Sequence, residues 1–305
     1  MELRHLMAFV MVAEELHFGR AAERLSIAQP QLSQHVRRLE ADLGVNLFER
    51  STRSVRLTQS GQAMLEPARK VLRDTDLARR AAILGTAEIV GRVVIGYAGA
   101  SSREVLPQLA RAVRAEQPGI ELALHSLVYG GAAPAQVASG AVDIGFSRLP
   151  VNRNDVRTRV FTYERVVAAL PADHPLASRP QVKLQDLADE PFVTFPATQG
   201  STVRGAMMRL THEAGFTPHI LQEAPDSYTI LGLVAAGVGV TLTVSSVQHI
   251  DTPGLVYRDL EGPAIHLAPV LVWRRLNLSL ATQSVLDILE RIFPTPAIRP
   301  DYVLD

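Results

Sequence analysis

A stripe of four apolar residues near the N-terminus constrains the fold of this chain more than any other feature. The stripe consists of Leu32, Val36, Leu39 and Leu43, which are four, three and four residues apart. These spacings place all four on one side of an α-helix. At about 100° per residue, Gln34 lies on the opposite side, and Gly44 favours the end of the helix. The segment is therefore predicted to be a helix with one buried side and one polar side that can face a partner.

Two shorter helices are expected before this one. The first is marked by apolar residues at spacings of three and four, namely Leu6, Phe9, Ala13 and Leu16. A second helix is expected over residues 20–25, where Ala21 and Ala22 allow another helix to approach closely. A turn follows, and Pro30 suits the first turn of the next helix because the N–H that it lacks has no acceptor there.

The segment after the third helix alternates in the manner of a β-hairpin, with residues 45–50 and 55–58 on either side of a polar tip. Three small helices followed by such a hairpin predict a winged helix-turn-helix. In that fold the third helix enters the major groove, and the wing, led here by Arg53, lies along the backbone or the minor groove. A small helical domain with ordinary solvated faces is the alternative.

Charge alone does not point to nucleic acid. The chain carries 31 basic and 31 acidic residues, and residues 1–65 hold eight arginines against seven acidic residues. Affinity for DNA must therefore come from where the arginines lie, and from a second chain that doubles them, because phosphate contacts set most of it.

An ordered set of short motifs runs through residues 17–61. It comprises Ala21-Ala22, Gln29-Pro30, Leu32-Ser33, Leu39-Glu40, Leu43-Gly44, Leu47-Phe48-Glu49-Arg50, Leu57-Thr58 and Gly61. Together these motifs resemble the DNA-binding domain of LysR-type transcriptional regulators. The resemblance implies contacts to double-stranded promoter DNA from Gln29, Pro30, Gln31, Ser33, Gln34, Arg37, Arg38, Arg50 and Arg53. Many relatives have proline in place of Gln31 and arginine in place of Gln34, so the operator sequence is expected to differ from theirs.

Residues 59–85 are expected to form one long helix with a heptad-like seam. The seam consists of Met64, Ala68, Val71, Thr75, Ala78 and Ala82. Its small side chains favour close approach of a second helix, and the resemblance implies a dimer interface that sets the distance between two recognition helices. Packing of this helix on its own domain is the alternative. Pro67 is expected to kink the helix, and residues 84–88 are interpreted as a hinge.

From residue 91 onward the pattern changes to that of an α/β domain. Strands are expected over 92–97, 120–127, 142–146 and 269–274, and helices near 106–113 and over 133–139 and 280–293. Helix–strand units are expected over 202–214 and 227–242. The β-α-β-α-β order of the first part implies a parallel sheet covered by helices. Two crossover segments, 157–163 and 262–267, would divide the domain into two lobes with a cleft between them. The proline-rich tail is expected to be loosely held.

Four segments of this part, LPQLARAVRAEQPGIEL, GAVDIGFSRL, ADHPLA and LGLVAAGVGVTL, resemble the LysR effector domain, an α/β fold with two lobes like those of periplasmic binding proteins. The predicted organisation is a winged helix-turn-helix over 1–58, a linker and dimerisation helix over 59–90, and an effector-binding domain over 91–305, with lobe I at 91–160 and 267–295 and lobe II at 161–266. GFSRL and the opening MELRHL look most like the branch that controls degradation of aromatic compounds.

Ligands of open α/β sheets bind beyond the C-terminal ends of the strands. At that edge the loop 99–102 offers N–H and hydroxyl groups to an anion, and Arg148 offers a bidentate partner to a carboxylate. The expected effector-binding residues are Gly99, Ala100, Ser101, Ser102, Gly130, Phe146, Arg148, Gly200, Ser201 and Thr202. The alternatives are that Ser101 or Ser102 only caps a helix, and that Arg148 is an ion-pair partner.

Several classes of function lack support in the sequence. The absence of cysteine excludes disulfides, thiolate metal sites and thiol catalysis. The nine histidines show no metal-binding spacing, and no nucleophile elbow, dinucleotide fingerprint or Walker motif is present. The opening segment is interpreted as an amphipathic helix, not a signal peptide, and residues 229–249 as a helix–turn–strand unit, not a membrane span. No metal, cofactor or catalytic residue is expected.

These observations favour a cytoplasmic, ligand-responsive transcriptional regulator without enzymatic activity. Its expected partners are promoter DNA, a small anionic effector such as an aromatic or other organic acid, RNA polymerase, and copies of itself in a homodimer or homotetramer. A solute-binding protein would share the two-lobed cleft but would leave the winged helix-turn-helix without a role. An enzyme with an appended DNA-binding module would lack any catalytic constellation.

Overall fold

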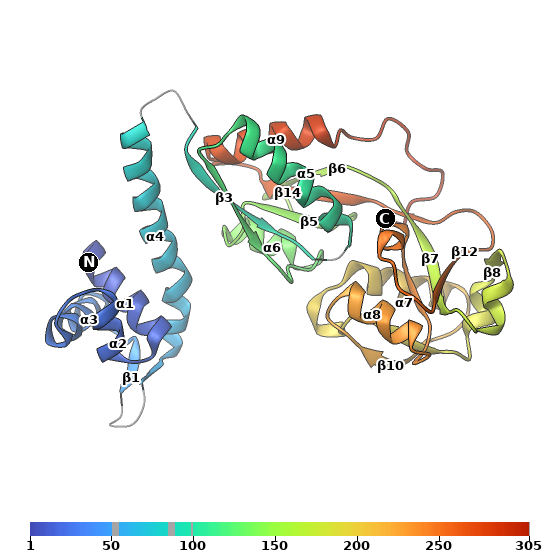
Figure 1. The fold of residues 1–305 in the computed structure, drawn as a ribbon, viewed down its shortest axis with the longest axis horizontal. Helices are drawn as coiled ribbons and strands as arrows, with labels where there is room; N and C mark the ends of the chain where they lie inside the picture. The colour runs from blue at the N-terminus through green and yellow to red at the C-terminus, as the bar shows by residue number, and fades with distance from the viewer. Residues whose placement is uncertain (51–54, 85–88, 99, 305) are drawn as a thin grey trace. The chain divides into compact units, whose positions relative to one another are not determined.

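The computed structural model describes residues 1–50, 55–84, 89–98 and 100–304. The chain forms two compact units, Met1–Val90 and Gly91–Asp305 (Figure 1).

The N-terminal unit is a winged helix-turn-helix, as the sequence predicts. Its helices are α1 (Leu3–Glu15), α2 (Phe18–Arg24), α3 (Gln29–Leu43) and α4 (Gln59–Leu84). Strands β1 (Phe48–Arg50) and β2 (Val55–Leu57) pair antiparallel and lie between α3 and α4 in the chain. Phe9, Leu32 and Leu39 are fully buried in the core that α1, α2 and α3 share.

The ends of these helices follow local capping. α2 begins two residues before its predicted start because His17 Nδ1 accepts the N–H of Arg20 at 3.2 Å. Gly44 ends α3 with φ at 71°, as predicted. The prediction that Leu43 faces the core is wrong, since its side chain is 40% exposed. Its angle around the helix matches the stripe, so the exposure follows from its place in the last turn, where α3 extends past the core.

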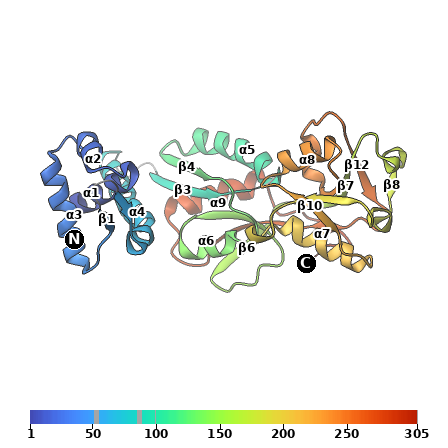
Figure 2. The same ribbon diagram turned by 90° about the horizontal axis from the view of Figure 1, so that it is seen from below.

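The first lobe of the C-terminal unit is built on a five-stranded sheet of order β4-β3-β5-β14-β6. The strands are β3 (Gly91–Gly96), β4 (Ile120–His125), β5 (Ile144–Arg148), β6 (Val156–Val160) and β14 (Pro269–Arg274). The first three are parallel, and β14 runs antiparallel to both β5 and β6. Helices α5 (Ala100–Glu116) and α9 (Leu280–Ile292) pack together on one side, and α6 (Ala133–Ser139) packs on the other (Figure 2).

The second lobe contains a larger mixed sheet, antiparallel except for the parallel pair of β12 and β8, and a smaller separate parallel pair. The large sheet has β7 (Glu164–Pro171), β8 (Gln181–Val182), β11 (Thr241–Val244), β12 (Leu255–Leu260) and β13 (His266–Leu267), and the pair is β9 (Pro191–Thr194) with β10 (His219–Glu223). Helices α7 (Thr202–Glu213) and α8 (Ser227–Ala235) and four 3₁₀ helices (Pro175–Ser178, Leu184–Leu187, Ala197–Gln199 and Ser245–His249) complete it. The fold class predicted from the sequence, a winged helix-turn-helix followed by a two-lobed α/β domain, is therefore confirmed.

The C-terminal tail differs from its prediction. His266 and Val303 form a bridge, in which the N–H of His266 donates to Tyr302 O at 3.0 Å and the N–H of Leu304 to His266 O at 2.8 Å. Leu304 is buried in the core of the second lobe. The expectation of a loosely held tail is wrong because one apolar residue after the prolines reaches this core. No helix among the described residues combines the length and apolar character needed to cross a membrane.

Candidate functional site

The polar side of α3 has the exposure that contact with DNA requires. Leu32, Val36 and Leu39 are buried on the opposite side of this helix. The predicted DNA-contacting residues on α3 are exposed, except for the half-buried Ser33: Gln29, Pro30, Gln31, Gln34, Arg37 and Arg38. Within the described part of the chain, the side chains of Arg37 and Arg38 form no hydrogen bond or ion pair. Both guanidinium groups are therefore available to phosphates or bases.

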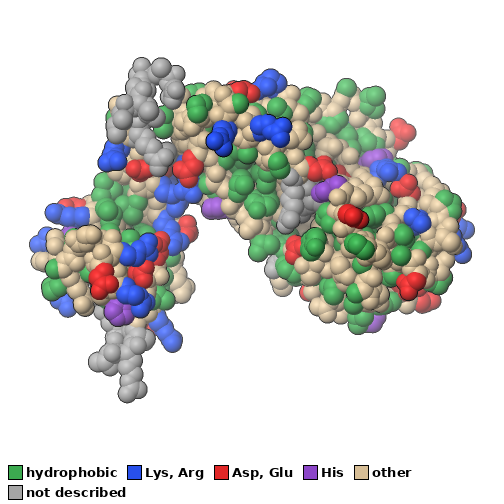
Figure 3. Space-filling model, in the orientation of Figure 1, with side chains coloured by type: hydrophobic (Ala, Val, Ile, Leu, Met, Phe, Trp, Pro, Cys, Tyr) green, Lys and Arg blue, Asp and Glu red, His purple; other side chains and the backbone are tan. Residues whose placement is uncertain are grey.

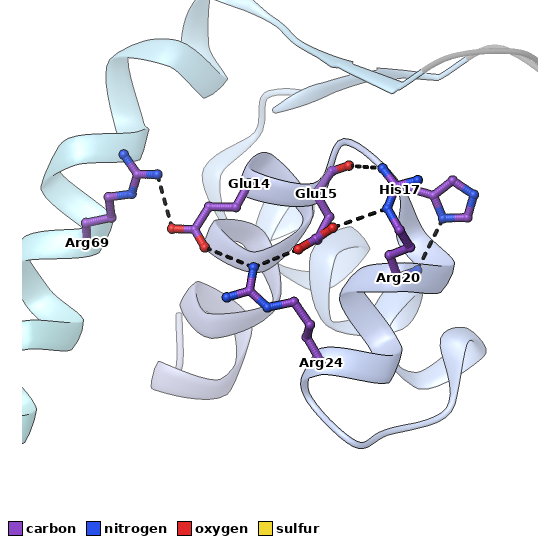
Figure 4. A network of polar contacts seen from close by, with 6 residues as sticks. All are labelled: Glu14, Glu15, His17, Arg20, Arg24 and Arg69. Carbon is purple, nitrogen blue, oxygen red and sulfur yellow. Dashed lines mark hydrogen bonds and ion pairs between the residues drawn. The ribbon is translucent and has the colours of Figure 1, made fainter.

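The arginines of α2 have a different role. Glu15 accepts hydrogen bonds from Arg20 Nε at 3.2 Å and Arg24 Nη1 at 2.6 Å, and these two arginines lower the pKa of Glu15 (Figure 4). Glu14 lies 3.7 Å from Arg24 Nη1 and 3.1 Å from Arg69 Nη2 of α4. The network thus joins α1, α2 and α4 and matches the positive charge of α2 with carboxylates. Figure 3 shows charged side chains of both signs intermixed over this unit.

Side chains from two of the motifs, Glu40 and Thr58, fix the hairpin to the helices. Glu40 Oε1 accepts the N–H groups of Leu47 at 2.9 Å and Phe48 at 3.2 Å. Thr58 Oγ1 donates to Asn46 O at 2.7 Å and accepts the N–H of Gly61 at 3.0 Å. These motif residues therefore stabilise the fold of the N-terminal unit. Arg53 and the side chain of Arg50 lie outside the described residues, so their predicted contacts stay predictions.

The predicted seam of α4 divides into two parts. Ala68 is only 2% exposed, and with the half-buried Met64 it packs on the core of its own unit. The alternative of packing on the same domain therefore holds for this part, since Ala68 has almost no surface left for a second chain. Val71, Thr75, Ala78 and Ala82 are exposed, and their role in a dimer stays a prediction. Most of the predicted hinge, residues 85–88, lies outside the described residues.

Arg148, at the end of β5, is held in a nearly buried ion pair between the two lobes. Its Nε and Nη2 donate to Glu164 Oε2 at 3.1 and 2.7 Å, and its Nη1 donates to Thr202 Oγ1 at 3.1 Å. The side chains of Arg148 and Glu164 are 11% and 3% exposed. Arg148 is therefore an ion-pair partner that also lines the cleft, and its contact with an effector stays a prediction.

The cleft around Arg148 encloses a cavity of about 20 Å³. Its lining residues are Ala98, Tyr129, Gly130, Arg148, Phe195, Ser201, Thr202, Val203, Ser227, Thr243 and Val244. This volume suits about one water molecule. The lobes also touch here, since the N–H of Gly131 donates to Gly200 O at 2.9 Å, and a Cβ on Gly131 would lie 2.5 Å from that oxygen. A ligand larger than water would therefore require the lobes to separate.

Sequence reasoning placed some residues of the cleft correctly and others not. Gly130, Arg148, Ser201 and Thr202 line the cavity, and Gly200 adjoins it through Gly131. Phe146 does not line it, because it packs edge-to-face on Phe161, with 5.7 Å between ring centroids. Ser102 is fully buried and donates to Ala98 O at 3.2 Å, and Ser201 also caps α7. Gly99 and the side chains of Ala100 and Ser101 lie outside the described residues.

Sequence reasoning missed three side chains that shape the cleft. Tyr129 and Phe195 form an edge-to-face pair across the lobes, with ring centroids 6.2 Å apart. The Tyr129 hydroxyl donates to Pro225 O, and burial, with a contribution from Asp226, raises its pKa. Glu164 is the third. Two signals in the sequence could have found the aromatic residues. Tyr129 stands directly before the predicted site residue Gly130, and Phe195 directly follows the buried strand β9. Among the described residues, no group of three or more histidines and carboxylates could hold a metal ion.

Two protein-family models match the chain. The model for "Bacterial regulatory helix-turn-helix protein, lysR family" matches residues 3–62, and the model for "LysR substrate binding domain" matches residues 86–293. The second match alone spans more than half of the chain. The chain belongs to the LysR family.

Relatives of this LysR-family protein cover nearly its whole length. The transcriptional regulator ShiR of Corynebacterium glutamicum (strain R) is 40% identical over 293 residues, which are 96% of this chain and 99% of ShiR. AlsR of Bacillus subtilis (strain 168) is 34% identical, with 91% of each chain covered. The structure of full-length CbnR with its target DNA matches with a TM-score of 0.79 at 26% identity, covering 95% of this chain and 99% of CbnR.

As a LysR-family protein, the chain is a DNA-binding transcriptional regulator with an effector-binding domain, and it is not an enzyme. This confirms the leading prediction from the sequence. The alternatives of a solute-binding protein and of an enzyme with an appended DNA-binding module are excluded, because the regulatory helix-turn-helix and the effector domain belong to one family architecture.

Proposed function

We propose that this LysR-family regulator recognises an interrupted inverted repeat with α3 from each of two chains. Residues 1–58 bind DNA, residues 59–90 join two chains, and residues 91–305 sense the effector. The available guanidinium groups of Arg37 and Arg38 support this proposal, because the nearby Arg20 and Arg24 are already paired with carboxylates. Base edges or the DNA backbone are contacted by the other predicted residues of α3, namely Gln29, Pro30, Gln31, Ser33 and Gln34. Arg50 and Arg53 of the wing bind phosphates.

In the proposed assembly, two chains form a dimer through the exposed part of α4. Two such dimers then form a homotetramer. Four small or β-branched side chains on α4 support close helix–helix contact. They are Val71, Thr75, Ala78 and Ala82. The assembly works in the cytoplasm, where the promoter and RNA polymerase are its partners.

The effector is a small organic anion that binds in the cleft at Arg148. A carboxylate would take the Arg148 hydrogens that now point to Thr202, and an apolar body would lie against Tyr129 and Phe195. Because the cavity has room for only about one water molecule, effector binding would favour a conformation with the lobes further apart. Such a shift would change the spacing of the DNA-binding units and the bend of the promoter.

The DNA-binding part of the proposal is tested with Arg37→Ala. Affinity for DNA upstream of the protein's own gene should fall at least about tenfold, because one contact per half-site is lost. Fluorescence anisotropy of labelled DNA measures it, and Arg111→Ala, an exposed arginine of α5, removes the same charge from the other unit. Equal affinity of both variants and the unchanged protein would reject the role of α3.

The effector part is tested by footprinting that DNA with the bound protein in the presence of a panel of aromatic and aliphatic carboxylates. At least one carboxylate should change the protected region, and Arg148→Lys should lose the change while still binding DNA. A footprint that no carboxylate alters would contradict an anionic effector.

A further inference from the structure

A second pocket lies in the first lobe, away from the cleft. Cross-strand pairing puts Trp273 of β14 opposite Arg157 of β6, and Leu271 opposite Arg159. Leu271 and Trp273 also stand opposite Phe146 and Ile144 of β5. On neighbouring β3, the same side of the sheet meets α9, where a Cβ on Gly91 would lie 2.3 Å from Ala281 Cβ. The pocket forms where this side of β6 and β14 faces α9.

The volume of the pocket is sufficient for a ligand with one six-membered ring. Its volume is about 190 Å³, and it is lined by Arg157, Arg159, Trp273, Arg275, Leu278, Gln283, Leu286, Asp287 and Glu290. An apolar cavity of about 150 Å³ is large enough to hold benzene. None of its lining residues lines the cavity at Arg148.

Charge in the pocket is positive and partly unpaired. Arg157 and Arg275 are exposed, and their side chains form no ion pair or hydrogen bond with any residue that the structure describes. Arg159 is 13% exposed, lies 2.8 Å from Glu290 through Nε, and donates to Phe293 O at 2.6 Å. Its Nη2 is buried and has no hydrogen-bond partner among the described residues.

The acidic side chains of the pocket set the charge of the ligand. Asp287 accepts a hydrogen bond from Gln283 Nε2 at 2.8 Å, and Glu290 is paired with Arg159. Three arginines against these two carboxylates leave one net positive charge in the lining. One negative charge on a ligand is therefore balanced, whereas a second would face Asp287 and Glu290 without a cation.

We propose that this pocket is a second ligand site that binds a flat, single-ring organic monoanion. The anionic group takes paired hydrogen bonds from Arg157 or Arg275, which match the geometry of a carboxylate. The ring packs on Trp273, with Leu278 and Leu286 beside it, since an indole gives a wide apolar surface. The proposal is independent of the cleft, so the two sites stand or fall separately.

Trp273 makes the proposal directly measurable because it is the only tryptophan in the chain. Titration of the full chain with 4-nitrobenzoate should quench its fluorescence with a saturable curve. The uncharged 4-nitrobenzamide should need at least about tenfold higher concentration, because it lacks the charge-assisted hydrogen bonds. Benzoate should restore the fluorescence by competition, and acetate, which has no ring, should not.

Substitutions in the pocket test whether 4-nitrobenzoate binds there. Arg157→Gln with Arg275→Gln should weaken quenching at least about tenfold, and both side chains are exposed and unpaired, so the fold should keep its melting temperature. Arg153→Gln is the matched control, since Arg153 is also an exposed arginine but pairs with Asp155 and does not line the pocket. Non-saturable quenching, equal quenching by the amide, or full affinity in the double variant would each overturn the proposal.

Discussion

At the scale of single residues, the pairing of Arg148 with Glu164 decides how the cleft can be probed. Glu164 lies on β7, in the second lobe, and both of the Arg148 hydrogen bonds to it converge on Oε2. Removal of the arginine would leave a nearly buried carboxylate without its cation. A variant that loses the effector response could then have lost stability and not an effector contact.

We expect Arg148→Ala to destabilise the C-terminal unit by about 3 kcal/mol, because one charge of a buried pair is left uncompensated. The double variant Arg148→Met with Glu164→Leu should recover most of this loss, since both charges are removed and the volume is kept. Urea unfolding of the full chain measures the difference. Equal stability of the single variant and the unchanged protein would mean that the pair is not formed in solution.

A histidine pair in the N-terminal unit makes its stability depend on pH. The rings of His5 and His35 lie 5.5 Å apart, and both His5 nitrogens are buried without a hydrogen-bond partner among the described residues. Burial, then His5, Arg4 and Arg38, lower the pKa of His35, against a smaller opposite effect of Glu2. As the pH falls through the ordinary histidine pKa of about 6.5, His35 takes up a proton in the unfolded chain before it does so in the folded chain. The free energy of unfolding therefore decreases as the pH falls.

Calorimetry of the full chain should therefore show a lower unfolding temperature at about pH 5.5 than at about pH 7.5. His35→Gln should reduce this dependence. The exposed His219, replaced in the same way, serves as the control and should leave it unchanged. A pH dependence that is the same in all three proteins would contradict the role of His35.

At the scale of elements, one glycine fixes α4 against the hairpin. A Cβ on Gly61 would lie 2.2 Å from Leu47 O, which is backbone and cannot turn aside. Gly61 belongs to the motif set of the DNA-binding domain, and this close approach is a physical reason for it. The sequence analysis placed Gly61 in the motif set, but the pattern of residues did not indicate that the carbonyl oxygen of Leu47 leaves no room for a side chain there.

We expect Gly61→Ala to destabilise the N-terminal unit by about 1–3 kcal/mol through overpacking. Gly205→Ala is the matched control, because Gly205 also lies inside a helix, α7, with no atom within 4 Å of its Cβ position. That substitution should stabilise by up to about 1 kcal/mol, since alanine favours helix. Thermal unfolding of both variants measures the opposite signs, and two effects of the same sign would contradict the contact.

At the scale of the whole molecule, the proposed assembly depends on the exposed part of α4. Val71 is 43% exposed although the helix around it is amphipathic, and Ala68, one turn earlier, is buried in its own unit. The part of the predicted seam that is accessible to a second chain therefore begins after Ala68. The proposed dimer places this surface, and not the whole predicted seam, at the interface.

Val71→Asp should shift the full chain toward monomers in sedimentation velocity and weaken its binding to the inverted repeat, because a carboxylate would be buried at the interface. Gln62→Asp adds the same charge on the opposite side of α4 and should leave the assembly unchanged. A variant at Val71 that sediments like the unchanged protein would place the dimer contact elsewhere.

The sequence by itself determined the winged helix-turn-helix, the long helix and the α/β order of the effector domain, since apolar periodicity and the Gly44 cap act over a few residues. It also named Arg148, Ser201 and Thr202. Only the tertiary structure decided that Arg148 is paired with Glu164, that Ala68 is covered, and that Leu304 anchors the tail. The reason is that residues far apart in the chain meet through packing, and periodicity along the sequence contains no information about which surfaces will meet.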